Sequence, residues 1–155
     1  MPLTLQVENF TLDFFSGIRL FTGFKISIGA TGDVTLGGAG SLITGGGPGF
    51  GIPASNYNVR KVRVRNSRDV NGATKDCSAA VISLWTGAAG TGTQLINGQT
   101  LSNLTANTAY QEVTLTAAAN NTMLTAGTLF LNVGTNVTGG FIDLDIYGDL
   151  IAGGL

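Results

Sequence analysis

From Tyr57 onward the sequence is a succession of short segments in which apolar and polar residues alternate, separated by turns rich in Gly, Asn and Thr. The clearest segment is Tyr57–Asn66, where valines alternate with basic residues. Alternation with period two is typical of a β-strand that buries one face. Because turn signals recur about every 8–12 residues, the pattern predicts an all-β fold, an antiparallel jelly-roll-like β-sandwich of about eight short strands.

Four further segments are expected to be strands: residues 78–85, 109–116, 128–133 and 141–148. The first of them is apolar on both faces, which indicates a central strand that is buried on both sides. Two very short strands are expected around Asn97-Gly98, because this dipeptide is typical of hairpin turns.

The last expected strand carries Asp143 and Asp145 on the face opposite its isoleucines and leucine. In a jelly roll the first and last strands are neighbours. If Tyr57–Asn66 is the first strand of the body, its basic residues therefore lie beside these two aspartates on one outer face. Opposite charges across a strand pair contribute only about 0.2–1 kcal/mol each, so they help to select the partner strand more than they stabilise the fold.

The first 53 residues have a different character. Glycine recurs from Gly29 to Gly51, and ordering such a segment costs much conformational entropy. The same region carries phenylalanines that are too apolar for a free linker. We therefore divide the chain into an N-terminal arm or extended β segment at residues 1–53, whose alternating runs such as Ile26 and Ile28 could form short strands, and a jelly-roll body at residues 54–155. The arm is expected to lie on its own domain or on another subunit. The phenylalanines expected at that contact are Phe10, Phe14, Phe15, Phe21 and Phe24.

Charged residues make up only 11% of the chain, where about 25% is usual. So little charge is typical of a surface that is buried against neighbours, so we expect a homo-oligomer or a subunit of a larger assembly. The formal net charge of −1 gives no overall attraction to nucleic acid. No apolar run approaches the roughly 20 residues of a membrane span. We therefore expect neither nucleic acid nor a membrane as partner.

The sequence shows no set of residues with recognisable catalytic chemistry. It contains no His, the commonest general base. Cys77 is the only cysteine, and we expect a half-buried, unreactive thiol. The glycine-rich stretches do not complete a phosphate-binding motif, and Asp143, Asp145 and Asp149 do not match a calcium loop. We predict that the protein is not an enzyme and has no cofactor and no metal site.

Basic residues cluster within and directly after the strand that begins at Tyr57. Few aromatic residues accompany them, which argues against a nucleic-acid surface. Pairing with Asp143 and Asp145, or with an acidic partner protein, explains the cluster better. The basic residues expected at such an interface are Arg60, Lys61, Arg63, Arg65 and Arg68.

Four stretches between Arg63 and Gly148 carry a family resemblance: residues 79–93, 101–105, 124–133 and 142–148. This part of the sequence resembles the jelly-roll bodies of capsid cement (decoration) proteins of tailed bacteriophages. The resemblance implies a structural virion protein that stabilises the phage head. It also implies a homotrimer on the outer capsid surface, seated at local three-fold positions and clamping neighbouring major capsid proteins. With a capsid as the implied partner, we expect the arm at residues 1–53 to contact either the capsid or another subunit.

An alternative function is a carbohydrate- or receptor-binding β-sandwich module of a phage fibre or tail. Its binding surface would use Trp85, Tyr110 or Tyr147, because an aromatic ring can stack on a sugar. Trp85 begins a loop at the end of an expected central strand. A tryptophan in that position more often fills the core.

Overall fold

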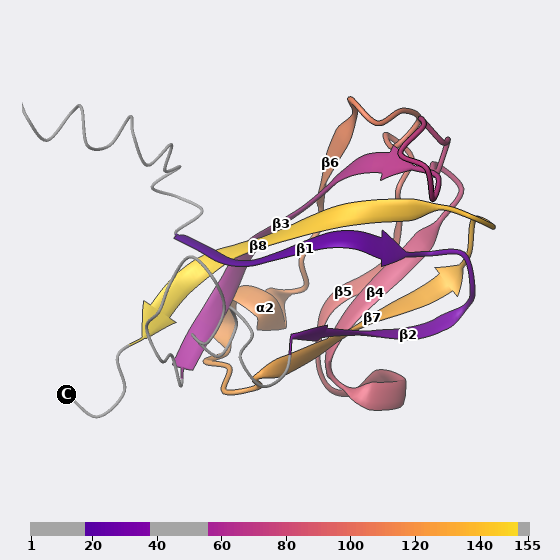
Figure 1. The fold of residues 1–155 in the computed structure, drawn as a ribbon. Helices are drawn as coiled ribbons and strands as arrows, with labels where there is room; N and C mark the ends of the chain where they lie inside the picture. The colour runs from indigo at the N-terminus through magenta and orange to yellow at the C-terminus, as the bar shows by residue number, and fades with distance from the viewer. Residues whose placement is uncertain (1–17, 38–55, 152–155) are drawn as a thin grey trace, which may run out of the picture.

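The computed structural model describes residues 18–37 and 56–151 (Figure 1). Its strands form two four-stranded antiparallel sheets. Sheet A consists of β1 (Ile18–Ser27), β8 (Phe141–Ile151), β3 (Asn56–Arg68) and β6 (Tyr110–Val113), in that order. Sheet B consists of β2 (Gly32–Gly37), β7 (Thr128–Thr135), β4 (Val81–Gly87) and β5 (Thr91–Thr100). Two short helical segments, η1 (Ala88–Gly90) and α2 (Ala117–Asn121), complete the described part of the chain.

The strand orders 1-8-3-6 and 2-7-4-5 are those of a jelly roll. In Figure 1 the two sheets lie as layers, with β1, β8 and β3 in the upper layer and β2, β7 and β4 in the lower one. The predicted fold class, an antiparallel β-sandwich of about eight strands, is confirmed.

The core lies between the sheets and is made by alternate residues of the central strands. Every second side chain of β8 from Ile142 to Ile146 is fully buried, and Val62 and Val64 on β3 are buried beside them. Burying one such side chain stabilises the folded state by roughly 1.5–3 kcal/mol. Tyr57 also lies in the core, where its hydroxyl donates a hydrogen bond to the Ala126 carbonyl at 2.6 Å. This burial raises the pKa of the Tyr57 hydroxyl.

The strand that begins near Tyr57 is the third strand of the sandwich, so the prediction that it comes first was wrong. Strands β1 and β2 precede it, within the region expected to be an arm. They join the body because β1 buries Leu20 and Ile26 beside β8, and β2 buries Leu36 beside β7. Residues 1–17 and 38–55 lie outside the described residues, and with them Phe10, Phe14, Phe15 and the remainder of the predicted arm.

Strand β4 pairs with β7 on one side and β5 on the other, as expected for a central strand. Its outward-facing residues are half-buried, so the expectation of burial on both faces was wrong. The prediction of a hairpin at Asn97-Gly98 was also wrong, because both residues lie inside the continuous strand β5. At this point the register between β5 and β4 shifts, opposite the β4 residues Ile82 and Leu84. Gly98 adopts a positive φ of 52°. The dipeptide therefore forms a β-bulge instead of a turn. Glycine suits such a bulge because it readily adopts a positive φ.

Candidate functional site

The outer face of sheet A arranges charged and aromatic side chains in cross-strand rows. In one row, Arg65 of β3 lies between Asp143 of β8 and Tyr110 of β6. In the next row, Arg63 lies between Asp145 and Glu112. Directly opposed residues share a face of the sheet, with Cβ atoms about 4.5–5.5 Å apart. We call this surface the charged face. It also carries Arg19 and Lys25 of β1, Arg60, Lys61 and Arg68 of β3, and Tyr147 and Asp149 of β8.

Two bulges in β3 bring all of its basic residues to the charged face. The pairing with β8 shifts between Val59 and Lys61, and again between Arg65 and Arg68. A bulge adds one residue and so reverses which side chains point inward. Without the second bulge, strict alternation would turn Arg68 toward the core. Asn66 lies in this bulge with a positive φ of 58°, a conformation that Asn tolerates better than most residues.

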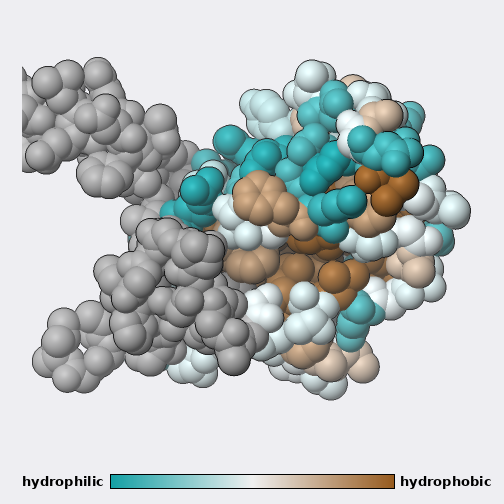
Figure 2. Space-filling view, viewed as in Figure 1, coloured by the Kyte–Doolittle hydropathy of each residue, from teal (hydrophilic) through white to brown (hydrophobic). Residues whose placement is uncertain are grey.

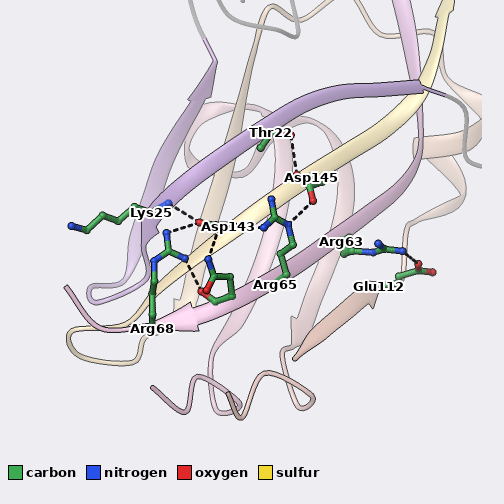
Figure 3. A network of polar contacts seen from close by, with 9 residues as sticks. Thr22, Lys25, Arg63, Arg65, Arg68, Glu112, Asp143 and Asp145 are labelled. Atoms are coloured by element: carbon green, nitrogen blue, oxygen red, sulfur yellow. Dashed lines mark hydrogen bonds and ion pairs between the residues drawn. The ribbon is translucent and has the colours of Figure 1, made fainter. Parts of the chain in front are cut away.

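Asp143 is the centre of the best-connected cluster on the charged face, although only 1% of it is exposed (Figure 3). Its carboxylate accepts hydrogen bonds from Arg68 Nη2 at 2.7 Å, from Asn66 Nδ2 at 2.8 Å and from the Lys25 backbone N–H at 2.9 Å. Arg65 Nη1 adds a longer contact at 3.5 Å. A buried carboxylate is stable only when it is paired in this way.

The contact from Lys25 depends on a bulge in β1. The register with β8 shifts between Gly23 and Ile26, and Lys25 has a positive φ of 54°. The bulge turns the Lys25 N–H away from the strand ladder and toward Asp143, as bulges beside functional groups often do. Edge strand β1 therefore supplies a backbone donor to a carboxylate of its neighbour.

Burial by itself would raise the pKa of the Asp143 carboxyl. Hydrogen bonds from Arg68, the Lys25 N–H and Asn66, together with the positive charge of Arg68, outweigh burial and hold the pKa below its ordinary value. Asp143 is thus a carboxylate at neutral pH, and its lone pairs are committed to donors within the chain.

Asp145 is equally buried but has fewer partners. It accepts hydrogen bonds from Arg65 Nε at 2.8 Å and from the Thr22 hydroxyl at 2.9 Å. The hydrogen bond to Asp145 raises the pKa of Arg65, more than burial lowers it. Arg65 therefore remains charged and bridges both aspartates, as Figure 3 shows.

The other basic residues of β3 pair with more exposed carboxylates. Arg63 Nη2 lies 2.8 Å from Glu112 Oε1, and Lys61 Nζ lies 3.8 Å from the same oxygen. Arg60 pairs with Asp149. The prediction that the cluster pairs with Asp143 and Asp145 is therefore confirmed for Arg65 and Arg68. The more exposed pairs, those of Arg60, Lys61 and Arg63, contribute little to the free energy of folding, about 0–1 kcal/mol each.

Four cations of the charged face lie over aromatic rings. Arg63 and Lys61 each lie 4.9 Å from a ring centroid, that of Tyr110 and Tyr147 respectively. Longer contacts join Lys25 to Phe141 at 5.6 Å and Arg65 to Phe24 at 5.8 Å. At these distances a cation is attracted to the face of the ring.

Two of the aromatic rings are highly exposed, Phe24 at 68% and Tyr110 at 59%. They lie on the two edge strands of sheet A, β1 and β6, so they flank the charge pairs of β8 and β3. Among the predicted interface phenylalanines, Phe24 is thus a surface residue. Phe21 is only 9% exposed and belongs to the core. In Figure 2 hydrophilic side chains dominate the upper part of the molecule, over β3, and hydrophobic ones show between β1 and β2.

Thr22, Lys25, Asn66 and Glu112 belong to the site but were not predicted as part of it. Glu112 and Tyr110 are two residues apart in an alternating segment. This spacing could have predicted that both side chains point outward from the same strand. The three-residue spacing from Arg65 to Arg68 breaks period two, and that break was the signal for the bulge at Asn66. The local sequence does not predict the contacts of Thr22 and Lys25, because these contacts depend on which strand lies beside β8.

Within residues 18–37 and 56–151, no three His, Cys, Asp or Glu residues are grouped so that they could hold a metal ion. Cys77 is fully buried, and desolvation raises the pKa of its thiol. No helix in the described part of the chain is long and apolar enough to cross a membrane.

Comparisons with known proteins leave the family open. The chain matches no protein-family model, no curated protein and no solved structure.

Proposed function

We propose that this chain is a structural virion protein of the cement (decoration) type, which binds the outer surface of a phage head through the charged face of sheet A. The observation that carries the proposal is the composition of that face. Exposed Phe24 and Tyr110, on the two edge strands, flank the arginines of β3. Phe, Tyr and Arg are among the residues that are enriched in protein interfaces.

The charge on this face favours an acidic protein surface as partner. Every Lys and Arg of the chain except Lys75 lies on β1 or β3. The carboxylates that meet them on the charged face are fewer: Glu112, Asp143, Asp145 and Asp149. The excess of positive charge would speed encounter with an acidic partner and set the orientation of docking. The buried pairs hold the arginines in place, which lowers the entropy lost on binding.

Stabilisation of the head would follow from mass action. A protein that binds the assembled shell, and not its separate subunits, stabilises the shell by its differential affinity for the two states. In the proposed arrangement the protein is a homotrimer, its partner is the major capsid protein, and it lies on the outside of the virion. The family resemblance and the chain's low charge content of 11% support this arrangement.

Heating of phage heads tests the proposal. Heads stripped of the protein are heated with and without purified protein added back, and release of the packaged DNA is followed by a dye. We expect release at a higher temperature after re-addition. Identical release temperatures, with the added protein bound, would rule out cementing.

A further inference from the structure

The outer face of sheet B has a chemistry unlike that of the charged face. The strands β2, β7, β4 and β5 contain no Lys, Arg or Glu, and their one charged residue is Asp33. Neutral hydroxyl and amide side chains take the place of ions. An anionic ligand such as nucleic acid would find no cation on these strands to replace its counterions.

Aromatic rings lie side by side in the middle of this face. Trp85 on β4 is directly opposite Phe130 on β7, and both are half-buried. The same row continues to Gln94 on β5 and Thr35 on β2. Trp85 is thus not a core residue, since it belongs to the outward-facing residues of β4. Together these side chains form a row across all four strands.

The row of rings is bordered by polar groups that can form hydrogen bonds. Asn132 and Ser83 are opposite each other in the next row, and Asp33 is opposite Asn132. The Asn132 amide donates to Asp33 at 2.8 Å, which leaves its carbonyl oxygen on the same face. The Ser83 hydroxyl accepts from the Gly98 N–H at 3.0 Å, so its own hydrogen can still be donated.

The segment η1 fixes one end of the row. Its Ala89 N–H donates to Asp33 Oδ2 at 2.7 Å, which ties this loop to β2, two strands away from β4. Ala89 has a positive φ of 54°, a conformation that is costly for a residue with a Cβ atom. Gly90 follows it against the indole of Trp85, where an added Cβ would lie 3.8 Å from the ring. The loop therefore holds the Trp85 ring in a defined position.

We propose that this neutral platform, made of Trp85, Phe130, Gln94, Thr35, Asn132 and Ser83, binds a neutral oligosaccharide. A pyranose presents an apolar face of C–H groups that stacks on aromatic rings, and a rim of hydroxyls that pairs with amides and hydroxyls. The absence of cations from these strands favours an uncharged sugar over a sialylated or sulfated one. The platform lies on the opposite side of the sandwich from the charged face, so the two surfaces can be occupied together. This inference does not depend on the proposed function.

The test uses a property of the sequence, because Trp85 is its only tryptophan. Purified protein is applied to an array of neutral and acidic glycans, and neutral ligands found there are titrated while tryptophan fluorescence is recorded. We expect binding of neutral glycans, with a saturable change in fluorescence that reports directly on Trp85. An array without binding, or binding confined to acidic glycans, would overturn the proposal.

Two variants complete the test. Phe130→Ala removes the second ring but leaves the fluorescent reporter in place, and we expect it to weaken binding by roughly tenfold or more. Tyr110→Ala makes a similar truncation on the charged face and should leave the affinity unchanged; unfolding curves for both variants verify that they fold. Equal losses in both variants would contradict the proposal. So would a fall in solution mass on Phe130→Ala, because the platform would then be a contact between copies of the chain.

Discussion

Sheet A carries every Lys and Arg of the chain except Lys75 on two of its strands, whereas the strands of sheet B carry one charged residue, Asp33. Both sheets contribute apolar side chains to the same core. The difference therefore lies only in what each sheet presents to the outside. A chain with so few charges has not spread them evenly for solubility but has concentrated the cations on one face. This asymmetry is the reason why we propose a protein partner for one face and a neutral ligand for the other.

The same comparison separates two ways of stabilising an outer face. Sheet A buries Asp143 and Asp145 beneath arginines, so removing one partner leaves buried charge behind. Sheet B has no such network of buried charges among its described residues, and the hydrogen bond that Asn132 donates to its one carboxylate, Asp33, is exposed. Loss of a buried partner is far more costly than loss of an exposed one.

The largest expected effect comes from Asp143→Ala. The substitution leaves Arg68, Asn66 and the Lys25 N–H without their shared acceptor, and we expect a loss of roughly 3–5 kcal/mol in the free energy of unfolding. Asp33→Ala on sheet B is the matched control, with an expected loss of about 0.5–1.5 kcal/mol. Urea unfolding of both variants measures the difference. Equal losses would mean that the buried network around Asp143 stabilises the protein no more than the exposed hydrogen bonds of Asp33.

Substitution of a glycine in each sheet should give a smaller difference. A Cβ at Gly148 of β8 would overlap the Asn58 carbonyl oxygen of β3, next to the bulge at Arg60. At Gly134 of β7 the nearest atom would be at an ordinary distance of 3.7 Å. We expect Gly148→Ala to cost about 1–3 kcal/mol and Gly134→Ala less than about 0.5 kcal/mol. Thermal unfolding measures both, and a tolerant Gly148 would show that β3 and β8 are less closely paired than described.

Acid should weaken the network around Asp143 on sheet A. The pKa of Asp143 is lower in the folded protein than in the unfolded chain, so its stabilising contribution is complete above the unfolded value of about 3.9 and is lost as pH falls. We expect the free energy of unfolding to decrease below about pH 5. Asp143→Asn should show a flatter pH dependence than the wild type. The same slope in both proteins would assign the acid sensitivity to other carboxylates.

The smallest effect is expected at the rim of the charged face. Arg60 and Asp149 are both well exposed, so Arg60→Gln should change the free energy of unfolding by no more than about 0.5 kcal/mol. The same substitution should reduce the rate of association with an acidic partner, an effect that grows as salt is lowered. A stopped-flow measurement at two salt concentrations checks this. A rate that does not depend on the substitution would place Arg60 outside the docking surface.

Much of sheet A could be predicted because its central strands keep period two. Val62 and Val64 alternate with basic residues, and Ile142, Leu144 and Ile146 alternate with aspartates, so the pairing of β3 with β8 followed from the pattern. The bulges were not predicted, since a bulge is a local departure from that same period. They decide where Arg68, Asn66 and Lys25 lie, and so they complete the site around Asp143.

Possible short strands were expected in the N-terminal region, but β1 and β2 were not assigned to the sandwich, for a related reason. The bulge at Lys25 breaks the alternation of β1, and glycine bounds β2 at both ends. The opposite error occurred at Asn97-Gly98, where a strong turn signal lies inside β5. In both cases pairing with a neighbouring strand overrides the local preference. Trp85 was placed more readily in the core than on the surface, because its half-buried position depends on the path of the following loop.

Docking of the protein through the charged face of sheet A is the central proposal. Co-sedimentation with phage heads that lack the protein tests it with two double variants of intact fold. Phe24→Ala with Tyr110→Ala should weaken binding by at least about tenfold, because exposed aromatic residues at an interface often contribute more than 1 kcal/mol each. Phe130→Ala with Gln94→Ala, on sheet B, should bind as the wild type does. Loss of binding in the second variant, with full binding in the first, would contradict the assignment of the two faces.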